Sequence, residues 1–463
     1  MKDSALKKQK ELAKWKRELT KKPYRGYGVM LIVMVALVHL LDEYASSSSG
    51  AIQSSVINEL FVQNMNTAGL SLFSLVSLLG LFAALAATVY KSLADRYGRR
   101  IFFVISAFGM GLGMLVCAMA RGAVAYFLGR AIIGFFTATD FQVMYIMEVA
   151  PDNKRGIFYS VTKSLGTLGI VLIAVVRGLF MNSDSGNWRM VYMVPAIVGI
   201  GECLCRGTLI SIGLAIVAMF ASRETNVFME RRIEKLEGEL SENAPTSAKS
   251  KKKSGNLRQA FRVAFKNRQL RMQLIATILF MGAMMPFTGY YESIMVSAGM
   301  STSDVTTALF FYPISWAVLL FISGFISDKK GRKFATILFG VMAAVALVGY
   351  IVGAEHGMHP VLVGLLLGAA IGSYWTSNNT IMLMTVEVAP TVLRASIQAV
   401  FGVIVMIGTL FFTAVYAALV AFVPLKGLCI GGGVICLAVS LCFVALATKE
   451  TAGRKLDSAN MDA

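Results

Sequence analysis

Nine ionisable side chains lie inside long apolar stretches of this 463-residue chain. A charge inside a bilayer is costly, so such groups are candidates for carrying protons or binding charged solutes. They are Asp42, Glu43, Arg130, Asp140, Lys163, Arg177, Glu202, Arg206 and, at the end of its stretch, Glu292. The sequence has no phosphate-binding glycine loop, and its three histidines form no metal-ligand spacing. We therefore expect no cofactor, no metal site and no enzymatic activity.

Asp42 and Arg130 lie at similar depth if their stretches cross a membrane as helices. Asp42 is about 15 residues into the first stretch, which places it ~22 Å from the face where that helix begins. Arg130 precedes the end of the fourth stretch by about 17 residues, ~26 Å from the same face. Glu43 points ~100° away from Asp42, so either acid can be the one that faces a central cavity. For His39, one turn before Glu43, a structural role is favoured over a proton relay.

Asp140 and Lys163 lie on either side of one turn. Asp140 precedes Glu148 by eight residues and Lys163 follows Arg155 by eight, so a helical hairpin brings both to ~10 Å above the turn. A buried ion pair with a structural role is one interpretation, and a binding site for a charged solute is the other.

Twelve apolar stretches of roughly 20 residues position these groups, and each is long enough to cross a hydrocarbon core of ~30 Å as a helix. The chain is 56% hydrophobic and 15% charged, whereas soluble proteins carry about 25% charged residues. The sequence therefore predicts an all-α membrane protein with twelve transmembrane helices and no cleaved signal peptide. The stretches are about 27–48, 67–90, 101–120, 123–147, 156–180, 190–221, 270–292, 303–326, 333–353, 360–386, 394–420 and 426–447.

The net charge of +18 follows this topology. Lys and Arg concentrate in residues 1–26 and in every second loop after it, whereas the opposite loops hold little more than Arg121, Arg189 and Lys426. This positive-inside pattern predicts cytoplasmic termini and a multi-pass protein of the inner (cytoplasmic) membrane. The lipid bilayer accounts for the charge, so we expect no nucleic-acid partner. The six cysteines lie in or near apolar stretches and are interpreted as small apolar residues.

The widest polar gap leaves six stretches on each side. It begins with a helix-like charged segment and continues as a Lys- and Ser-rich linker. The predicted divisions are a basic cytoplasmic tail at 1–26, a six-helix bundle at 27–222, a cytoplasmic linker with an amphipathic helix at 223–269, a six-helix bundle at 270–447 and a cytoplasmic tail at 448–463.

Three short signals recur in the same order in the two halves. They are Asp95-Arg96-Tyr97-Gly98-Arg99-Arg100 with Asp328-Lys329-Lys330-Gly331-Arg332-Lys333, the Glu-x-x-Pro-x-x-x-Arg loops that run from Glu148 to Arg155 and from Glu387 to Arg394, and Arg223-Glu224-Thr225 with Lys449-Glu450-Thr451. The repetition indicates a duplicated transporter with parallel pseudo-symmetric halves and a solute site between them.

These signals, with Gly129-Arg130-x-x-x-Gly134, make the chain similar to the major facilitator superfamily, and within it to the sugar porter group that includes organic cation and anion transporters. The resemblance covers all twelve stretches. It implies a monomeric secondary transporter that works by alternating access and closes its cytoplasmic side with charged pairs. We expect Asp95 to pair with Arg155 and Asp328 with Arg394. The implied gate residues are Asp95, Arg99, Glu148, Arg155, Asp328, Arg332, Glu387 and Arg394.

The resemblance also implies a proton-coupling pair. In proton-coupled sugar porters an acid on the first helix and the arginine of the Gly-Arg motif carry out coupling. Asp42, or Glu43, would then take a proton when Arg130 moves away, because a departing cation raises the proton affinity of a buried acid. A static ion pair in a facilitator is the alternative.

Two departures from sugar porters favour an organic acid as the solute. Lys163 stands about where sugar porters place a sugar-binding glutamine, and a lysine suits a carboxylate better than a hydroxyl. The seventh stretch has Met284-Met285-Pro286-Phe287 instead of paired glutamines. Aromatic rings and amides at mid-membrane suit a ring-shaped solute. The predicted binding residues are Lys163, Asp140, Tyr290, Tyr291, Tyr374, Trp375, Asn378 and Asn379.

We therefore expect an H⁺-coupled symporter of a small organic solute, leaning to an aromatic or carboxylic acid. The alternatives are an H⁺ symporter or facilitator of a sugar or polyol, a drug exporter, and a membrane sensor that binds its ligand without moving it. Such sensors usually carry a long signalling tail or loop. The segment after Lys449 and the central gap are short, which favours transport.

Overall fold

The computed structural model describes residues 9–17, 27–61, 67–92, 99–137, 155–181, 187–197, 229–230, 232–234, 236–237, 257–389 and 394–451. Every regular element within those residues is a helix. The predicted all-α class is therefore confirmed.

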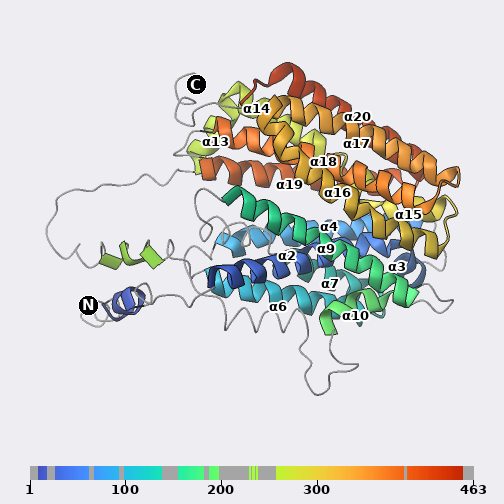
Figure 1. Ribbon diagram of the computed structural model, residues 1–463, viewed down its shortest axis with the longest axis horizontal. Coiled ribbons are helices and arrows are strands. Elements are labelled where there is room, and N and C mark those ends of the chain that lie inside the picture. Colours follow the sequence, from blue (N-terminus) through green and yellow to red (C-terminus); the bar gives the residue numbers. More distant parts are fainter. Residues whose placement is uncertain are drawn as a thin grey trace.

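The first half of the chain forms one bundle (Figure 1). Its described helices are α2 (Tyr27–Ala51), α3 (Gln53–Leu60), α4 (Thr67–Ser92), α6 (Arg99–Ala118), α7 (Ala123–Phe136), α9 (Arg155–Met181) and α10 (Arg189–Ile197). Apart from α3, these helices start within a few residues of the first six apolar stretches, because runs of apolar residues decide which part of the chain enters a bilayer. The stretches at 123–147 and 190–221 continue beyond the described residues.

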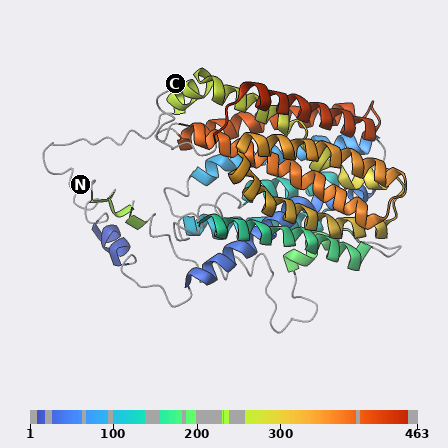
Figure 2. The same ribbon diagram turned by 45° about the horizontal axis from the view of Figure 1, so that its top comes forward.

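The second half forms a matching bundle beside the first (Figures 1 and 2). Its helices are α13 (Leu257–Lys266), α14 (Arg268–Met281), α15 (Tyr291–Ser297), α16 (Thr302–Lys330), α17 (Arg332–Glu355), α18 (Pro360–Val388), α19 (Arg394–Leu419) and α20 (Leu425–Ala447), with the π-helical turn η1 (Met285–Gly289) between α14 and α15.

The predicted seventh span, 270–292, is broken into three pieces. After α14 ends, Tyr290 donates its amide hydrogen to Met285 over 3.2 Å, which is a π-type bond five residues back. Pro286 has no amide hydrogen to give to the preceding turn, so the regular α-helical ladder is interrupted there. The break gives α15 a separate helical segment beside α2 and α3.

The contact between the halves is itself duplicated. α9 packs against α16, and α4 packs against α19. These are the fifth span against the eighth and the second against the eleventh. Since the second and eighth spans are equivalent in a six-plus-six duplication, and the fifth and eleventh likewise, the two contacts are related by the same pseudo-symmetry.

The surface of the bundle suits a bilayer. Among the described residues, seven helices are long and apolar enough to cross a membrane, and three shorter apolar helices accompany them. Large apolar side chains such as Phe82, Phe321 and Phe411 are exposed. In lipid these side chains contact acyl chains, and the helices satisfy their own backbone polar groups.

The helix at 9–17 and the end of α20 lie at one end of the bundle, which we call the terminal end; α3 and α15 lie at the other, the far end (Figure 1). At the terminal end the helix at 9–17 contacts the linker. The Arg232 guanidinium donates two hydrogen bonds, of 3.0 and 2.7 Å, to Glu11 Oε1, and Lys16 Nζ lies 2.7 Å from Glu237 Oε1. The hydrogen bond from Arg232 holds the pKa of Glu11 below its ordinary value.

Candidate functional site

The two acids of the first span lie on α2, which packs against α9. Asp42 is buried, with 3% of its surface exposed, and Glu43 is half-buried. His39 lies one turn earlier, with Nε2 3.7 Å from Glu43 Oε1. The structure therefore places a buried and a partly accessible carboxylate side by side on one helix.

Close helix contact fixes the position of these acids. A Cβ atom on Gly169 of α9 would lie 2.2 Å from the carbonyl oxygen of Leu40, and one on Gly166 would lie 2.4 Å from the ring of His39. Only glycine allows such an approach, so the backbones of α2 and α9 touch at the height of the acids. The two helices are packed as one unit at this level.

Arg130 lies on α7 and reaches α2. Its Nη1 donates to the carbonyl oxygen of Ala45 over 2.9 Å, and its Nη2 donates to that of Ser46 over 3.5 Å. Gly129 lets α7 approach α6, since a Cβ there would lie 2.5 Å from Cys117 Sγ. The Gly-Arg motif thus holds a guanidinium one turn beyond Asp42, and their direct pairing stays a prediction.

The predicted aromatic residues divide between the core and the interface. Tyr374 is stacked between Phe280 and Phe287, with both ring centroids at 4.7 Å, inside the second bundle. Tyr290 shares a 2.8 Å hydrogen bond with Ser74 of the first bundle, and Tyr291 donates to the carbonyl oxygen of Ser47 over 3.3 Å. Trp375 lies edge-on to Tyr374 with centroids 5.4 Å apart.

Helix α18 carries polar atoms that are suited to a solute. Ser373 Oγ, Thr376 Oγ1 and Asn378 Oδ1 are buried and make no hydrogen bond within the described part of the chain. Asn379, next in sequence, is exposed. Since buried polar atoms normally have a partner, these groups are available to hydrogen-bond a polar solute or water.

Several predicted site residues lie outside the described residues. Asp140, Asp95 and Glu148 are among them, together with Glu202 and Arg206. For four more, the helix is described but the side chain is not, and they are Lys163, Arg99, Arg155 and Arg394.

Three of the predicted gate residues, Asp328, Arg332 and Glu387, form a cluster at the terminal end. Arg332 Nη1 lies 2.8 Å from Asp328 Oδ1, and Arg332 Nε lies 3.2 Å from Glu387 Oε1. Glu450 accepts the backbone amides of Arg332 and Lys333 over 2.9 and 3.0 Å. A carboxylate at the start of α17 is favourable because the first amides of a helix lack partners. The repeated Lys-Glu-Thr signal marked Glu450 in the sequence without giving it this role.

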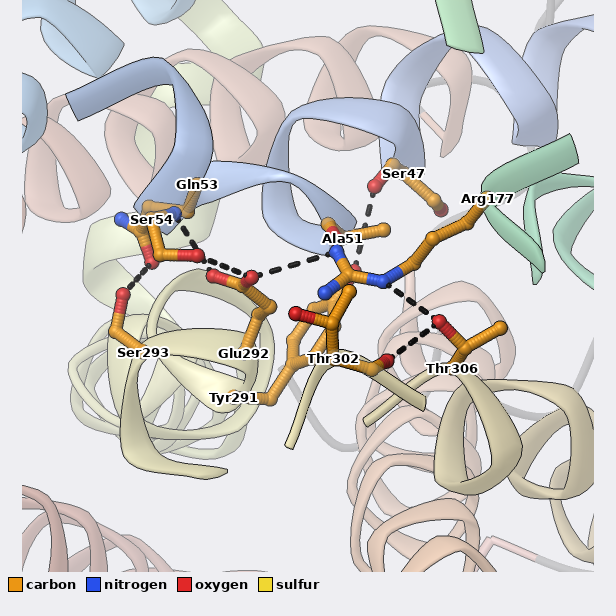
Figure 3. Close-up of polar contacts among 10 residues, drawn as sticks. All are labelled: Ser47, Ala51, Gln53, Ser54, Arg177, Tyr291, Glu292, Ser293, Thr302 and Thr306. Atoms are coloured by element: carbon orange, nitrogen blue, oxygen red, sulfur yellow. Dashed lines mark hydrogen bonds and ion pairs between the residues drawn. The ribbon is translucent and has the colours of Figure 1, made fainter. Parts of the chain in front are cut away.

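The far end holds a charged pair that the sequence did not join (Figure 3). Arg177 of α9 and Glu292 of α15 come from different halves, and Arg177 Nη1 lies 3.3 Å from Glu292 Oε1. Their side chains are 2% and 0% exposed. Both had been noted as ionisable residues in apolar stretches. The sequence did hold one signal of their proximity: each lies near the end of a predicted span that runs from the terminal end to the far end, so the two have similar depth.

Comparison with known proteins identifies families and relatives that are similar to this chain. The model of the Major Facilitator Superfamily matches residues 28–413. An arabinose-proton symporter of Escherichia coli (strain K12) is 28% identical over 343 residues, which cover 68% of this chain and 69% of the symporter. A facilitated glucose transporter, member 12 of solute carrier family 2 of Mus musculus, is 32% identical over 128 residues, which cover 27% of this chain and 20% of that protein.

A solved structure shares the fold. The crystal structure of a D-xylose-proton symporter superposes with a TM-score of 0.68 at 15% identity, covering 93% of this chain and 100% of the other. The family match spans most of the chain, and the helical bundle agrees with it over nearly its whole length. The chain therefore belongs to the Major Facilitator Superfamily.

Proposed function

We propose that this transporter is an H⁺-coupled symporter of a small organic acid, aromatic or carboxylic, that works by alternating access. The observation that carries the proton coupling is the arrangement on α2: Asp42 is buried, and the Arg130 guanidinium is held one turn beyond it by backbone oxygens. A cation near a buried acid favours its charged form, and withdrawing the cation favours protonation. Movement of α7 against α2 would thus take up and release a proton.

Positive charge along α9 supports an acidic solute. Positions 163 and 177, a lysine and an arginine, are 14 residues apart on this helix. That spacing is close to four turns at ~3.6 residues per turn, so the two positions share a face. α9 lies between α2, which carries the acids, and α16 of the other half. An anion entering between the halves therefore passes a cationic helix.

The proposed orientation puts the terminal end in the cytoplasm, in the inner membrane of the cell. The linker and the helix at 9–17 carry a high density of Lys and Arg, which favours the cytoplasmic side. We further propose that a single chain forms the complete transport unit, since both halves that enclose the path belong to it.

Transport assays on the purified protein test the proposal. A thermal-shift screen against sugars, aromatic acids and dicarboxylates identifies the solute class. Uptake of the identified acid into proteoliposomes is then compared with and without an imposed pH gradient. We expect uphill uptake only with the gradient, and loss of it in Asp42→Asn or Glu43→Gln, whichever acid couples. Uptake that is the same with and without the pH gradient would contradict proton coupling. Binding of the solute without uptake would indicate a sensor.

Symport or facilitated transport of a sugar is the second candidate. The arabinose-proton symporter, 28% identical over most of its length, is the specific observation that favours it. Stabilisation by arabinose or another sugar, with none by acids, in the thermal-shift screen would select this candidate.

A further inference from the structure

The Glu292 carboxylate lies in a cradle of donors that belong entirely to the other half of the molecule (Figure 3). Ser54 contributes its backbone amide at 2.8 Å from Oε2 and its hydroxyl at 2.5 Å from Oε1. Arg177 contributes Nη1 at 3.3 Å from Oε1. Two neutral donors and one cation thus converge on a single carboxylate. Such charge-assisted bonds are the strong ones in proteins.

The first half builds most of this cradle with its own residues. The Arg177 guanidinium also donates to the carbonyl oxygen of Ala51, at the end of α2. Ser54 lies in the first turn of α3, where backbone amides have no partner inside the helix and favour an anion. The second half adds one support, since Thr306 Oγ1 accepts from Arg177 Nε over 3.1 Å.

Opening of the far end withdraws the carboxylate. Glu292 belongs to α15 and Arg177 to α9, so the two part when the halves separate there. Separating the pair leaves the Arg177 cation without its carboxylate partner, which is unfavourable. An anion from solution that enters the vacated cradle offsets this cost. Glu292 is in this sense a stand-in for the carboxylate of a solute.

Aromatic rings beside the cradle indicate what the rest of the solute is. Tyr291, next to Glu292, lies 5.9 Å from the ring of Tyr312, and Tyr312 stacks on Trp316 at 6.4 Å between centroids. Trp316 Nε1 is buried and makes no hydrogen bond within the described residues. Rings of the second half thus form a chain that begins at Tyr291, next to the carboxylate site, and leads away from it along α16. An aromatic monocarboxylate matches both.

We propose that Arg177 and Ser54 form a carboxylate-binding site of the first half, which Glu292 fills while the far end is closed and the carboxylate of an aromatic acid fills while it is open. The site rests on alternating access as proposed above. It gives the transporter an entry site for acids at the far end, separate from the acids of α2. Glu292 and the solute compete for the same donors.

Competition predicts effects of opposite sign at the two members of the pair. The probe is benzoate, with methyl benzoate as the uncharged control, and the readout is the affinity measured by calorimetry and by the ligand-induced shift of thermal unfolding. Glu292→Gln removes the internal competitor, whose effective concentration is in the millimolar range or above, and we expect benzoate to bind ~tenfold tighter. Arg177→Gln removes the cation, and we expect ~tenfold weaker binding.

Further variants separate recognition from folding. Arg177→Lys keeps the charge and should recover part of the benzoate affinity. Methyl benzoate should bind all variants alike. Equal changes of the same sign in Glu292→Gln and Arg177→Gln would show that the pair only holds the halves together, and would overturn the proposal. Failure of Glu292→Gln to bind benzoate would also overturn it.

Failure of the carboxylate-site proposal can be distinguished from failure of the proposed function. Gradient-driven uptake with no benzoate response in any variant would contradict the carboxylate site and leave the H⁺ symport proposal standing. Benzoate binding with the expected opposite signs, but no gradient-driven uptake, removes H⁺ symport and keeps the site.

Discussion

The charged clusters at the two ends of the molecule differ in which half supplies them. At the terminal end, the described contacts of Arg332 join Asp328 and Glu387, all within the second half. At the far end, the described pair of Arg177 and Glu292 joins the two halves. A cluster inside one half moves with that half and keeps its bonds, whereas a pair between halves breaks when they part. Under the proposed alternating access, the far-end pair would therefore contribute to the free-energy difference between the closed and open conformations.

Breaking the far-end pair should give the largest effect. Arg177→Leu leaves the Glu292 carboxylate buried without its cation, and we expect the free energy of unfolding to fall by ~3–5 kcal/mol. Removing both charges in Arg177→Leu with Glu292→Leu should recover most of this loss, because no charge stays buried. Denaturation of the four members of this double-mutant cycle in detergent measures the coupling. A double variant as unstable as Arg177→Leu would show that the two charges do not interact.

Breaking the terminal-end cluster should lower the free energy of unfolding by less, and it should leave benzoate affinity unchanged. Arg332→Ala removes contacts to Glu387 and to the largely exposed Asp328, and we expect a loss of about 1–2 kcal/mol in the free energy of unfolding. Because this cluster lies within one half, benzoate affinity should stay as in the parent protein. A change of affinity as large as that in Arg177→Gln would remove the distinction between the two ends.

Two serines sharpen the comparison within the far end. Ser54 Oγ donates to Glu292, and Ser71 Oγ donates to the carbonyl oxygen of Ala417, so both hydroxyls bridge the halves at 2.5 Å. Each serine-to-alanine variant should lower the free energy of unfolding by ~1 kcal/mol. Only Ser54→Ala should weaken benzoate binding, and matched titrations of both variants check this. Equal effects of the two variants on benzoate affinity would show that Ser54 contributes to packing between the halves and not to binding of the carboxylate.

The tail contact should give the smallest effect, and one that depends on pH. The pKa of Glu11 is lowered by Arg232, so the contact contributes fully above the unfolded pKa and is lost as pH falls through the folded pKa. Trp15, whose Nε1 donates to Glu11 over 3.4 Å, reports the change in its fluorescence, taken as the difference from Trp15→Phe. Glu11→Gln should abolish the acid transition, and its persistence there would assign it to another group.

Patterns along the chain predicted the helices better than the contacts between them. Apolar length marked the spans because bilayer thickness imposes it on each segment separately. The break near Pro286 lay inside a run that reads as one span, and hydropathy does not register a missing amide hydrogen. The expected Asp328–Arg394 pair involves a side chain outside the described residues, while Asp328 contacts Arg332 across the turn at Gly331 that joins α16 to α17.

The far-end pair was out of reach for a different reason. Arg177 and Glu292 are 115 residues apart and belong to separate bundles, so their meeting depends on how the halves dock. Each charge alone signalled function through its cost in a membrane. Which charges meet is a property of the interface, and no local pattern records it.

The contact of Gly169 with the carbonyl of Leu40 has a mechanical consequence. With the backbones of α2 and α9 touching at the height of Asp42, the acid and Arg177 belong to one stiff lever whose other arm ends at the far side of the membrane. In the transport mechanism proposed above, an anion that binds Arg177 would therefore act on the same packed unit that carries Asp42.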